Sequence, residues 1–131
     1  MKAKTPRESF AEMTELVLPN DTNTIGHLMG GRMMHYMDIV AAIASMRHSN
    51  RVCVTASVDY VDFRMGIRLG EVIVLQAKVT RAFNTSMEVR IDVFAEDTTR
   101  GERRKSNTAF FTFVAVDQVG RPIPVNPLQP E

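Results

Sequence analysis

One acidic side chain in the middle of an apolar stretch is the clearest candidate for chemistry in this chain. Asp38 follows Met37 and precedes residues 39–43 (IVAAI). Because burying an unpaired carboxylate is costly, such a group faces water, finds a hydrogen-bond donor, or becomes neutral. A carboxylate that is partly desolvated in a cleft can serve as a general base that activates water. The alternative is a position on a narrow wet edge of a helix, paired with Arg32 or His35.

A glycine pair precedes this acid, at the point where a helix is predicted to begin. Gly30 and Gly31 would let a substrate approach the backbone N–H groups closely. These donors, at the positive end of the helix dipole, would stabilise the oxyanion formed when water attacks a carbonyl. A tight turn before the helix is the alternative. Asp38 lies two helical turns further on, roughly 10 Å at ~1.5 Å per residue. Since that is far for one small substrate, we expect a second chain to contribute.

The loop before the glycines, residues 20–27 (NDTNTIGH), supplies further polar groups. Turn chemistry explains most Asn and Asp residues in such loops, but an amide can also orient a water or hold a carbonyl, so Asn23 is a candidate. His27 and His35 could act as bases, although neither has an obvious nucleophilic partner. The sequence contains no G-x-S-x-G elbow and no phosphate loop.

Composition excludes several functional classes. The 131 residues suffice for one domain, 1–131, and the 44% hydrophobic and 24% charged fractions are typical of an ordinary soluble protein. A net charge of +1 with scattered Lys and Arg gives nucleic-acid binding no support. No apolar stretch approaches the roughly 20 residues that span a bilayer, and the N-terminus lacks the apolar core of a signal peptide. We therefore expect a cytoplasmic protein with no membrane partner.

Metal binding has equally little support. The single cysteine, Cys53, and three histidines do not form a zinc spacing. We expect no metal site and no internal disulfide.

The periodicity of apolar residues predicts one strand, one helix and then four strands. Loose alternation indicates a strand over 10–18, and residues 19–21 (PND) read as a breaker. Apolar residues at three- and four-residue spacing predict a mostly buried helix from Arg32 to about His48. Period-two stretches predict strands over 52–63, 71–83, 86–97 and 103–117.

Short connections between the later strands indicate antiparallel neighbours, because a parallel return needs a longer crossover. One helix against a sheet of about five strands is an α+β arrangement, and such long strands would curl around the helix. The tail, 118–131, carries four prolines from Gly120 onward. It is therefore expected to be extended.

Residues 19–48 and 54–63 (VTASVDYVDF) closely resemble the hotdog-fold acyl-CoA thioesterases, namely the YciA-like enzymes and the cytosolic acyl-CoA hydrolases. The similarity continues through 84–89, 109–117 and 120–131, and so covers nearly the whole chain after about Phe10. It implies a curved antiparallel sheet of five or six strands wrapped around one long helix. It further implies hydrolysis of acyl-CoA to free acid and CoA, with no cofactor.

The resemblance also assigns roles. In these relatives the helix acid, which matches Asp38, is a general base or nucleophile, and the loop asparagine matches Asn23. The glycine pair matches Gly30 and Gly31, whose amides would meet the thioester oxygen. The family's sites lie at a dimer interface, with the asparagine and the acid on opposite chains, and dimers commonly form hexamers as trimers of dimers.

Coenzyme A carries several phosphate charges, which require Arg or Lys nearby. The sequence does not rank the available arginines, which are Arg64, Arg68, Arg81 and Arg90. The resemblance suggests four CoA-binding candidates, Phe63, Arg64, Asn84 and Ser86, for each of which an exposed strand position is the alternative. The chain departs from many relatives at Met29, where they carry His or Phe, and at Gly66, where they carry proline. Both departures leave the preferred acyl chain length open.

Two other functions remain open from the sequence. One is a hotdog hydratase or dehydratase of acyl thioesters, in which His27 or His35 would have to serve. The other is a non-catalytic module that binds acyl-CoA and reports through its oligomeric state, because one fold hosts many functions. The set of Asn23, the glycine pair and Asp38 favours catalysis.

Overall fold

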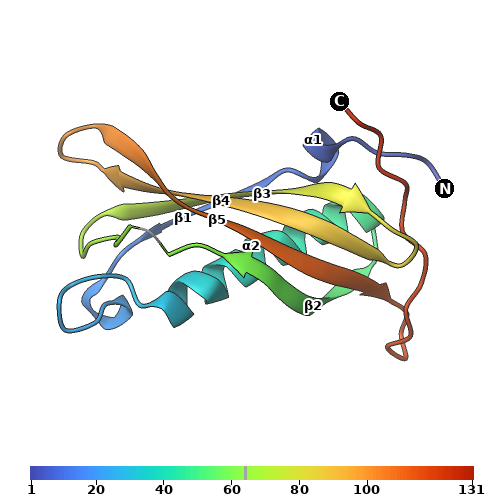
Figure 1. Ribbon diagram of the computed structural model, residues 1–131, viewed down its shortest axis with the longest axis horizontal. Coiled ribbons are helices and arrows are strands. Elements are labelled where there is room, and N and C mark those ends of the chain that lie inside the picture. The colour runs from blue at the N-terminus through green and yellow to red at the C-terminus, as the bar shows by residue number, and fades with distance from the viewer. Residues whose placement is uncertain (64) are drawn as a thin grey trace.

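A long helix lies along one face of a five-stranded sheet (Figure 1). The computed structural model describes residues 1–63 and 65–131. The helix is α2 (Gly30–Ser49), and the strands are β1 (Ala11–Leu16), β2 (Val52–Val61), β3 (Val72–Ala82), β4 (Ser86–Asp97) and β5 (Glu102–Val116). Among the described residues, no helix is long and apolar enough to cross a membrane.

The strands follow the order β1-β3-β4-β5-β2, and every neighbouring pair is antiparallel. The sequence predicted that consecutive strands after the helix lie side by side in the sheet. This is right for β3 with β4 and for β4 with β5, but wrong for β2 with β3, which are not neighbours. The link over 62–71 crosses three strand spacings, roughly 14 Å at ~4.8 Å each. About ten residues at ~3.3 Å each easily span that distance. The link thus carries the chain across the sheet, past the start of α2.

Several element boundaries differ from the prediction. The glycine pair forms the first two residues of α2, which begins two residues earlier than expected. The helix ends at Ser49 and is capped by Asn50 in a left-handed conformation with φ 55°. Strand β4 has its predicted bounds, whereas β2 stops at Val61. Two short helices were not predicted: α1 (Pro6–Ser9) and the 3₁₀ turn η1 (Pro19–Asp21), which occupies the predicted breaker.

The core lies between α2 and the sheet. The periodic helix positions that predicted burial are all buried, namely Met33, Met37, Val40, Ala41 and Ala44. They face the inward side chains of the central strands, which include Ile91, Phe111 and Phe113. The helix therefore packs against one face of the sheet, as the α+β prediction required.

Strand β2 is an edge with an unusual surface. Among the residues that the structure describes, β2 pairs with β5 alone, and its side chains Val52, Val54, Val58 and Tyr60 are all exposed. Long apolar edge strands are usually covered in stable proteins, because their open N–H and C=O groups promote pairing with another chain. The exposed apolar side chains and the open strand edge are therefore typical of a surface that contacts another chain.

Beyond β5, the C-terminal tail is extended and has no helix or strand of its own. Its backbone pairs with Lys4, through Lys4 N–H to Pro127 O at 3.0 Å and Gln129 N–H to Lys4 O at 2.7 Å. The ring of the buried His48 lies 2.8 Å from Asn126 O, which joins the tail to the end of α2.

Candidate active site

Asp38 lies on the side of α2 that faces β2 and is half-buried. Thr55 on β2 donates a hydrogen bond from Oγ1 to Asp38 Oδ1 at 2.5 Å. Thr55 is opposite the buried Phe113 in β5, so its side chain points toward the helix. The alternative of an ion pair with Arg32 or His35 is wrong for the part of the chain that the structure describes, because Arg32 pairs with Asp21 at 3.2 Å and none of the ion pairs there joins His35 to Asp38. The carboxylate is thus held by a neutral donor and keeps its second oxygen for water or substrate.

The first turn of α2 presents open backbone donors. Its first internal bond runs from Met33 N–H to Met29 O at 3.0 Å, and Met29 provides no side-chain cap. Within the described part of the chain, the N–H groups of Gly30 and Gly31 have no acceptor, as expected at a helix N-terminus. A Cβ on Gly31 would meet nothing within 4 Å, so an incoming group has free access.

Phe63 borders this helix start. A Cβ built on Gly30 would lie 3.8 Å from Phe63 Cζ, an ordinary van der Waals contact. Of the three CoA-binding candidates that the structure describes, Phe63 is therefore the one placed beside the glycine pair. Arg64 lies outside the described residues.

The loop over 22–29 fixes the orientation of the Asn23 amide. Asn23 Oδ1 accepts hydrogen bonds from the N–H groups of Ile25 and His27 at 3.0 and 3.1 Å. The Asn23 N–H in turn donates to His27 O at 2.8 Å. The side-chain oxygen thus serves the turn, as one reading of the sequence proposed. Asn23 is exposed, and none of the described residues accepts a hydrogen bond from its Nδ2 group.

Asn23 and Asp38 lie on different elements of the chain. Asp38 is eight residues beyond Gly30, roughly 12 Å along the helix at ~1.5 Å per residue, whereas Asn23 is held in the loop before the helix. The two candidate residues are thus presented by different elements of the chain.

Asn84 and Ser86 lie at the β3–β4 turn, at the opposite end of the sheet from Phe63. Ser86 pairs with Val114, which also pairs with Val54 near the start of β2. The candidates for CoA binding thus fall into two groups that a single chain does not bring together.

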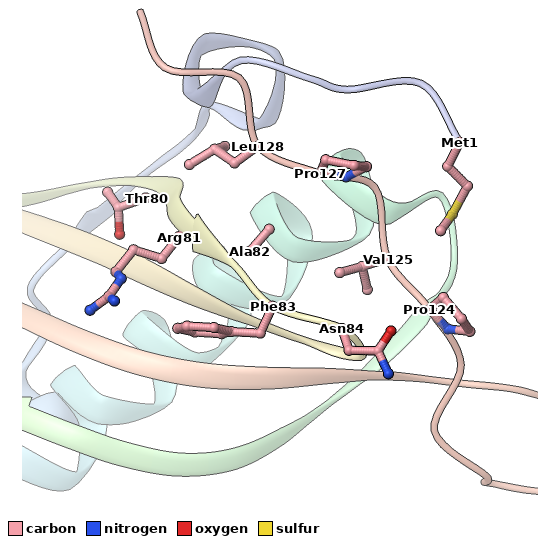
Figure 2. Close-up of a pocket in the computed structure, with 10 residues that line it drawn as sticks. All are labelled: Met1, Thr80, Arg81, Ala82, Phe83, Asn84, Pro124, Val125, Pro127 and Leu128. Carbon is pink, nitrogen blue, oxygen red and sulfur yellow. The ribbon is translucent and has the colours of Figure 1, made fainter.

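A cavity of about 540 Å³ lies beside the β3–β4 turn. Figure 2 shows Phe83 and Asn84 at its base, with Val125 of the tail beside Asn84 and Leu128 on the far side. The Arg81 guanidinium lies 5.3 Å from the centroid of the Phe83 ring. Arg90, by contrast, pairs with Asp92 at 3.2 Å, so it is less available for a phosphate than Arg81.

Comparison with known proteins places this geometry in a family. The thioesterase superfamily model matches residues 25–102, which include the glycine pair, Asp38 and Thr55. The chain is 42% identical over 125 residues to the uncharacterized acyl-CoA thioester hydrolase YkhA of Bacillus subtilis (strain 168), covering 95% of this chain and 73% of that protein. The chain belongs to the thioesterase superfamily.

Solved structures of thioesterases agree closely with the fold. The acyl-CoA hydrolase of Staphylococcus aureus in complex with butyryl coenzyme A and coenzyme A has a TM-score of 0.94 at 35% identity, over 98% of this chain and 79% of that one. A hexameric acyl-CoA thioesterase has a TM-score of 0.96 at 39% identity, over 100% and 84%. The hotdog fold expected from the sequence is confirmed. The chain spans 33% of the length of the rat cytosolic acyl coenzyme A thioester hydrolase, another relative.

The contact between Thr55 and Asp38 is one that sequence reasoning missed. The alternation of residues 52–63 indicated which side chains share a face, but it did not indicate that β2 would lie at the edge beside Asp38. Only the long-range pairing of β2 with β5 places this hydroxyl against the helix.

Behind the Asn23 loop, a charged pair holds the β2–β3 link. Arg104 on β5 donates to Glu71 from Nη1 to Oε2 at 2.6 Å and from Nη2 to Oε1 at 3.0 Å. Arg104 Nη2 also lies 2.9 Å from Gly66 O. Hydrogen bonds from Arg104, supported by the Arg68 backbone N–H, lower the pKa of Glu71 below its ordinary value.

This pKa shift predicts an acid sensitivity. A carboxylate whose folded-state pKa is lowered stabilises the fold above its unfolded pKa, about 4.3 for glutamate, and loses that contribution as pH falls through the folded value. Glu71→Gln should therefore reduce the fall in the free energy of unfolding between about pH 7 and pH 3. Denaturant titration at both pH values measures it, with the exposed Glu102→Gln as control. Identical pH dependence in wild type and Glu71→Gln would contradict the assignment.

Proposed function

We propose that this thioesterase hydrolyses acyl-CoA to a free acid and CoA, with Asp38 as general base or nucleophile. The observation that carries the proposal is the half-buried Asp38 carboxylate, bonded to Thr55 and lying on the same helix as the open Gly30 and Gly31 amides. Relatives with this fold are named acyl-CoA hydrolases, which supports the substrate class.

In the general-base route, the free oxygen of Asp38 takes a proton from water, and the water oxygen bonds to the thioester carbonyl carbon. The carbonyl oxygen becomes negative and is stabilised by the Gly30 and Gly31 N–H groups of a second copy of the chain, because those of the same chain lie roughly 12 Å along α2 from Asp38. The Nδ2 group of Asn23 adds a third donor, since its side-chain oxygen is occupied. Collapse of the intermediate breaks the C–S bond, and the CoA thiolate takes up the proton. Water is the only co-reactant, so the reaction needs no cofactor.

A second copy of the chain completes each site in this proposal. The exposed apolar edge β2 suits pairing with another β2, and the Asp38–Thr55 pair lies beside that edge. A two-fold dimer built there would bring the partner's loop, with its asparagine, toward Asp38. The hexameric relatives support a trimer of such dimers.

Variants of the Staphylococcus aureus hydrolase give independent support for the residue roles. In three solved structures an asparagine, an aspartate or a threonine is replaced by alanine. These three residues follow the same order and the same intervals along the chain as Asn23, Asp38 and Thr55. The threonine in this set supports a role for Thr55 in the reaction.

The cavity at the β3–β4 turn suits the nucleotide end of CoA. It offers the Phe83 ring for stacking, the Asn84 amide for hydrogen bonds and the Arg81 guanidinium for a phosphate. Ser86 lies next to this turn, whereas Phe63 beside the glycine pair would contact the thioester end. We place the enzyme in the cytoplasm, a location supported by its similarity to a rat cytosolic hydrolase.

The decisive test replaces Asp38 by Asn. Thiol release from short, medium and long acyl-CoA should fall by about 10²- to 10⁴-fold in kcat, because the carboxylate that activates water is lost. Size-exclusion chromatography should show an unchanged oligomer. Wild-type rates in Asp38→Asn would refute the role of Asp38.

The same assay separates the other functions. Loss of the double bond of crotonyl-CoA without thiol release would favour a hydratase. Saturable binding of acyl-CoA without either reaction would favour a sensing module.

The Thr55 hydroxyl gives a second prediction. Thr55→Val keeps the shape but removes the hydrogen bond to Asp38, and a bond to a charged group contributes about 1.5–3 kcal/mol. We expect kcat to fall by about tenfold or more, with little change in KM. Thr55→Ser, which retains the hydroxyl, should stay near wild type. Equal kcat in the valine and serine variants would contradict the role of this hydrogen bond.

A further inference from the structure

The ring of His27 lies directly over the backbone of Gly66, in space that only a glycine leaves free. A Cβ built on Gly66 would lie 2.5 Å from His27 Nδ1, 2.7 Å from Cε1 and 3.1 Å from Cγ. Real Cβ atoms do not approach other heavy atoms within 3.0 Å, so an added methyl must displace the ring. The φ of Gly66 is not in the left-handed region, in contrast to Gly26 and Gly70. Glycine at 66 therefore serves space, not backbone conformation.

Gly66 itself is held from the other side. Its carbonyl accepts a hydrogen bond from Arg104, whose guanidinium is also fixed by the two bonds to Glu71. The neighbouring link residues bind the Asn23 loop directly, through Leu28 N–H to Ile67 O at 2.7 Å and Leu69 N–H to Gly26 O at 2.8 Å. A methyl group at position 66 would thus press on His27 while its own backbone is restrained.

His27 is joined to the Asn23 side chain. The His27 N–H donates to Asn23 Oδ1, and the His27 carbonyl accepts from the Asn23 N–H. These two bonds set the direction in which Asn23 Nδ2 points. A shift of His27 therefore rotates the donor that the proposed mechanism uses.

We propose that Gly66 is a positioning residue for Asn23: its missing side chain seats the His27 ring, and that contact fixes the loop that presents the Asn23 donor. The inference rests on the proposed function. Misplacement of a catalytic group by about 1 Å can cost up to about 10²-fold in rate. The effect should appear in kcat more than in KM, because the Asn23 donor is proposed to act on the oxyanion that forms only during the reaction.

A double-mutant cycle on the full chain tests the proposal. Gly66→Ala should lower kcat for acyl-CoA hydrolysis by about tenfold, with KM changed less than about twofold. In the His27→Ala background, where the ring is absent, Gly66→Ala should change kcat by less than about twofold. Thermal unfolding and size-exclusion chromatography monitor folding and assembly.

The outcomes distinguish this inference from the proposed function. If the His27 ring simply swings into the adjoining cavity near Arg68, Gly66→Ala will retain the wild-type kcat and the positioning role is wrong. An equal loss with and without the His27 ring would also overturn it, since the steric contact would then be irrelevant. A wild-type chain that releases no thiol from any acyl-CoA would instead refute the proposed function.

Discussion

The hydrogen bond between Thr55 and Asp38 connects the helix to the edge of the sheet at the one place where the apolar helix carries an acid. A half-buried carboxylate needs a donor, and a cation in that position would neutralise it and weaken it as a base. A threonine hydroxyl satisfies one oxygen without adding charge. This arrangement explains how α2 tolerates Asp38 so close to the core residues Met37 and Val40, and it leaves the other oxygen available for water.

In the rest of the proposed site, as in Asp38, one atom of a polar group is held by the fold and another is left for the substrate. Asn23 commits its side-chain oxygen to its own loop and keeps its amide donor exposed. Gly30 and Gly31 begin the helix, so their N–H groups lack acceptors within it, and a Cβ on Gly31 would meet nothing within 4 Å. Within each chain, the Asp38 carboxylate and the donors of Asn23, Gly30 and Gly31 thus lie at separate places. The exposed β2 edge provides a surface on which a second copy can bind and bring its own donors near Asp38.

Much of this arrangement could be predicted from the sequence because it depends on local pattern. The spacing of Met33, Met37 and Val40 defined the buried face of the helix, and alternation defined β4. Asp38 was conspicuous because it interrupts that face. The order of the strands was not accessible, since pairing β2 with β5 rather than with β3 depends on contacts far apart in the chain. Thr55 and the seating of His27 on Gly66 depend on that order, so local pattern did not reveal them.

Complementation between two inactive variants tests most directly whether two chains form each site. Chains carrying Asn23→Ala or Asp38→Ala are co-expressed at equal levels, so that half of the dimers combine one of each. If the asparagine and the acid of one site come from opposite chains, each mixed dimer contains one intact site, and thiol release recovers to about a quarter of the wild-type rate. Activity no higher than that of either variant alone would show that both residues act within one chain.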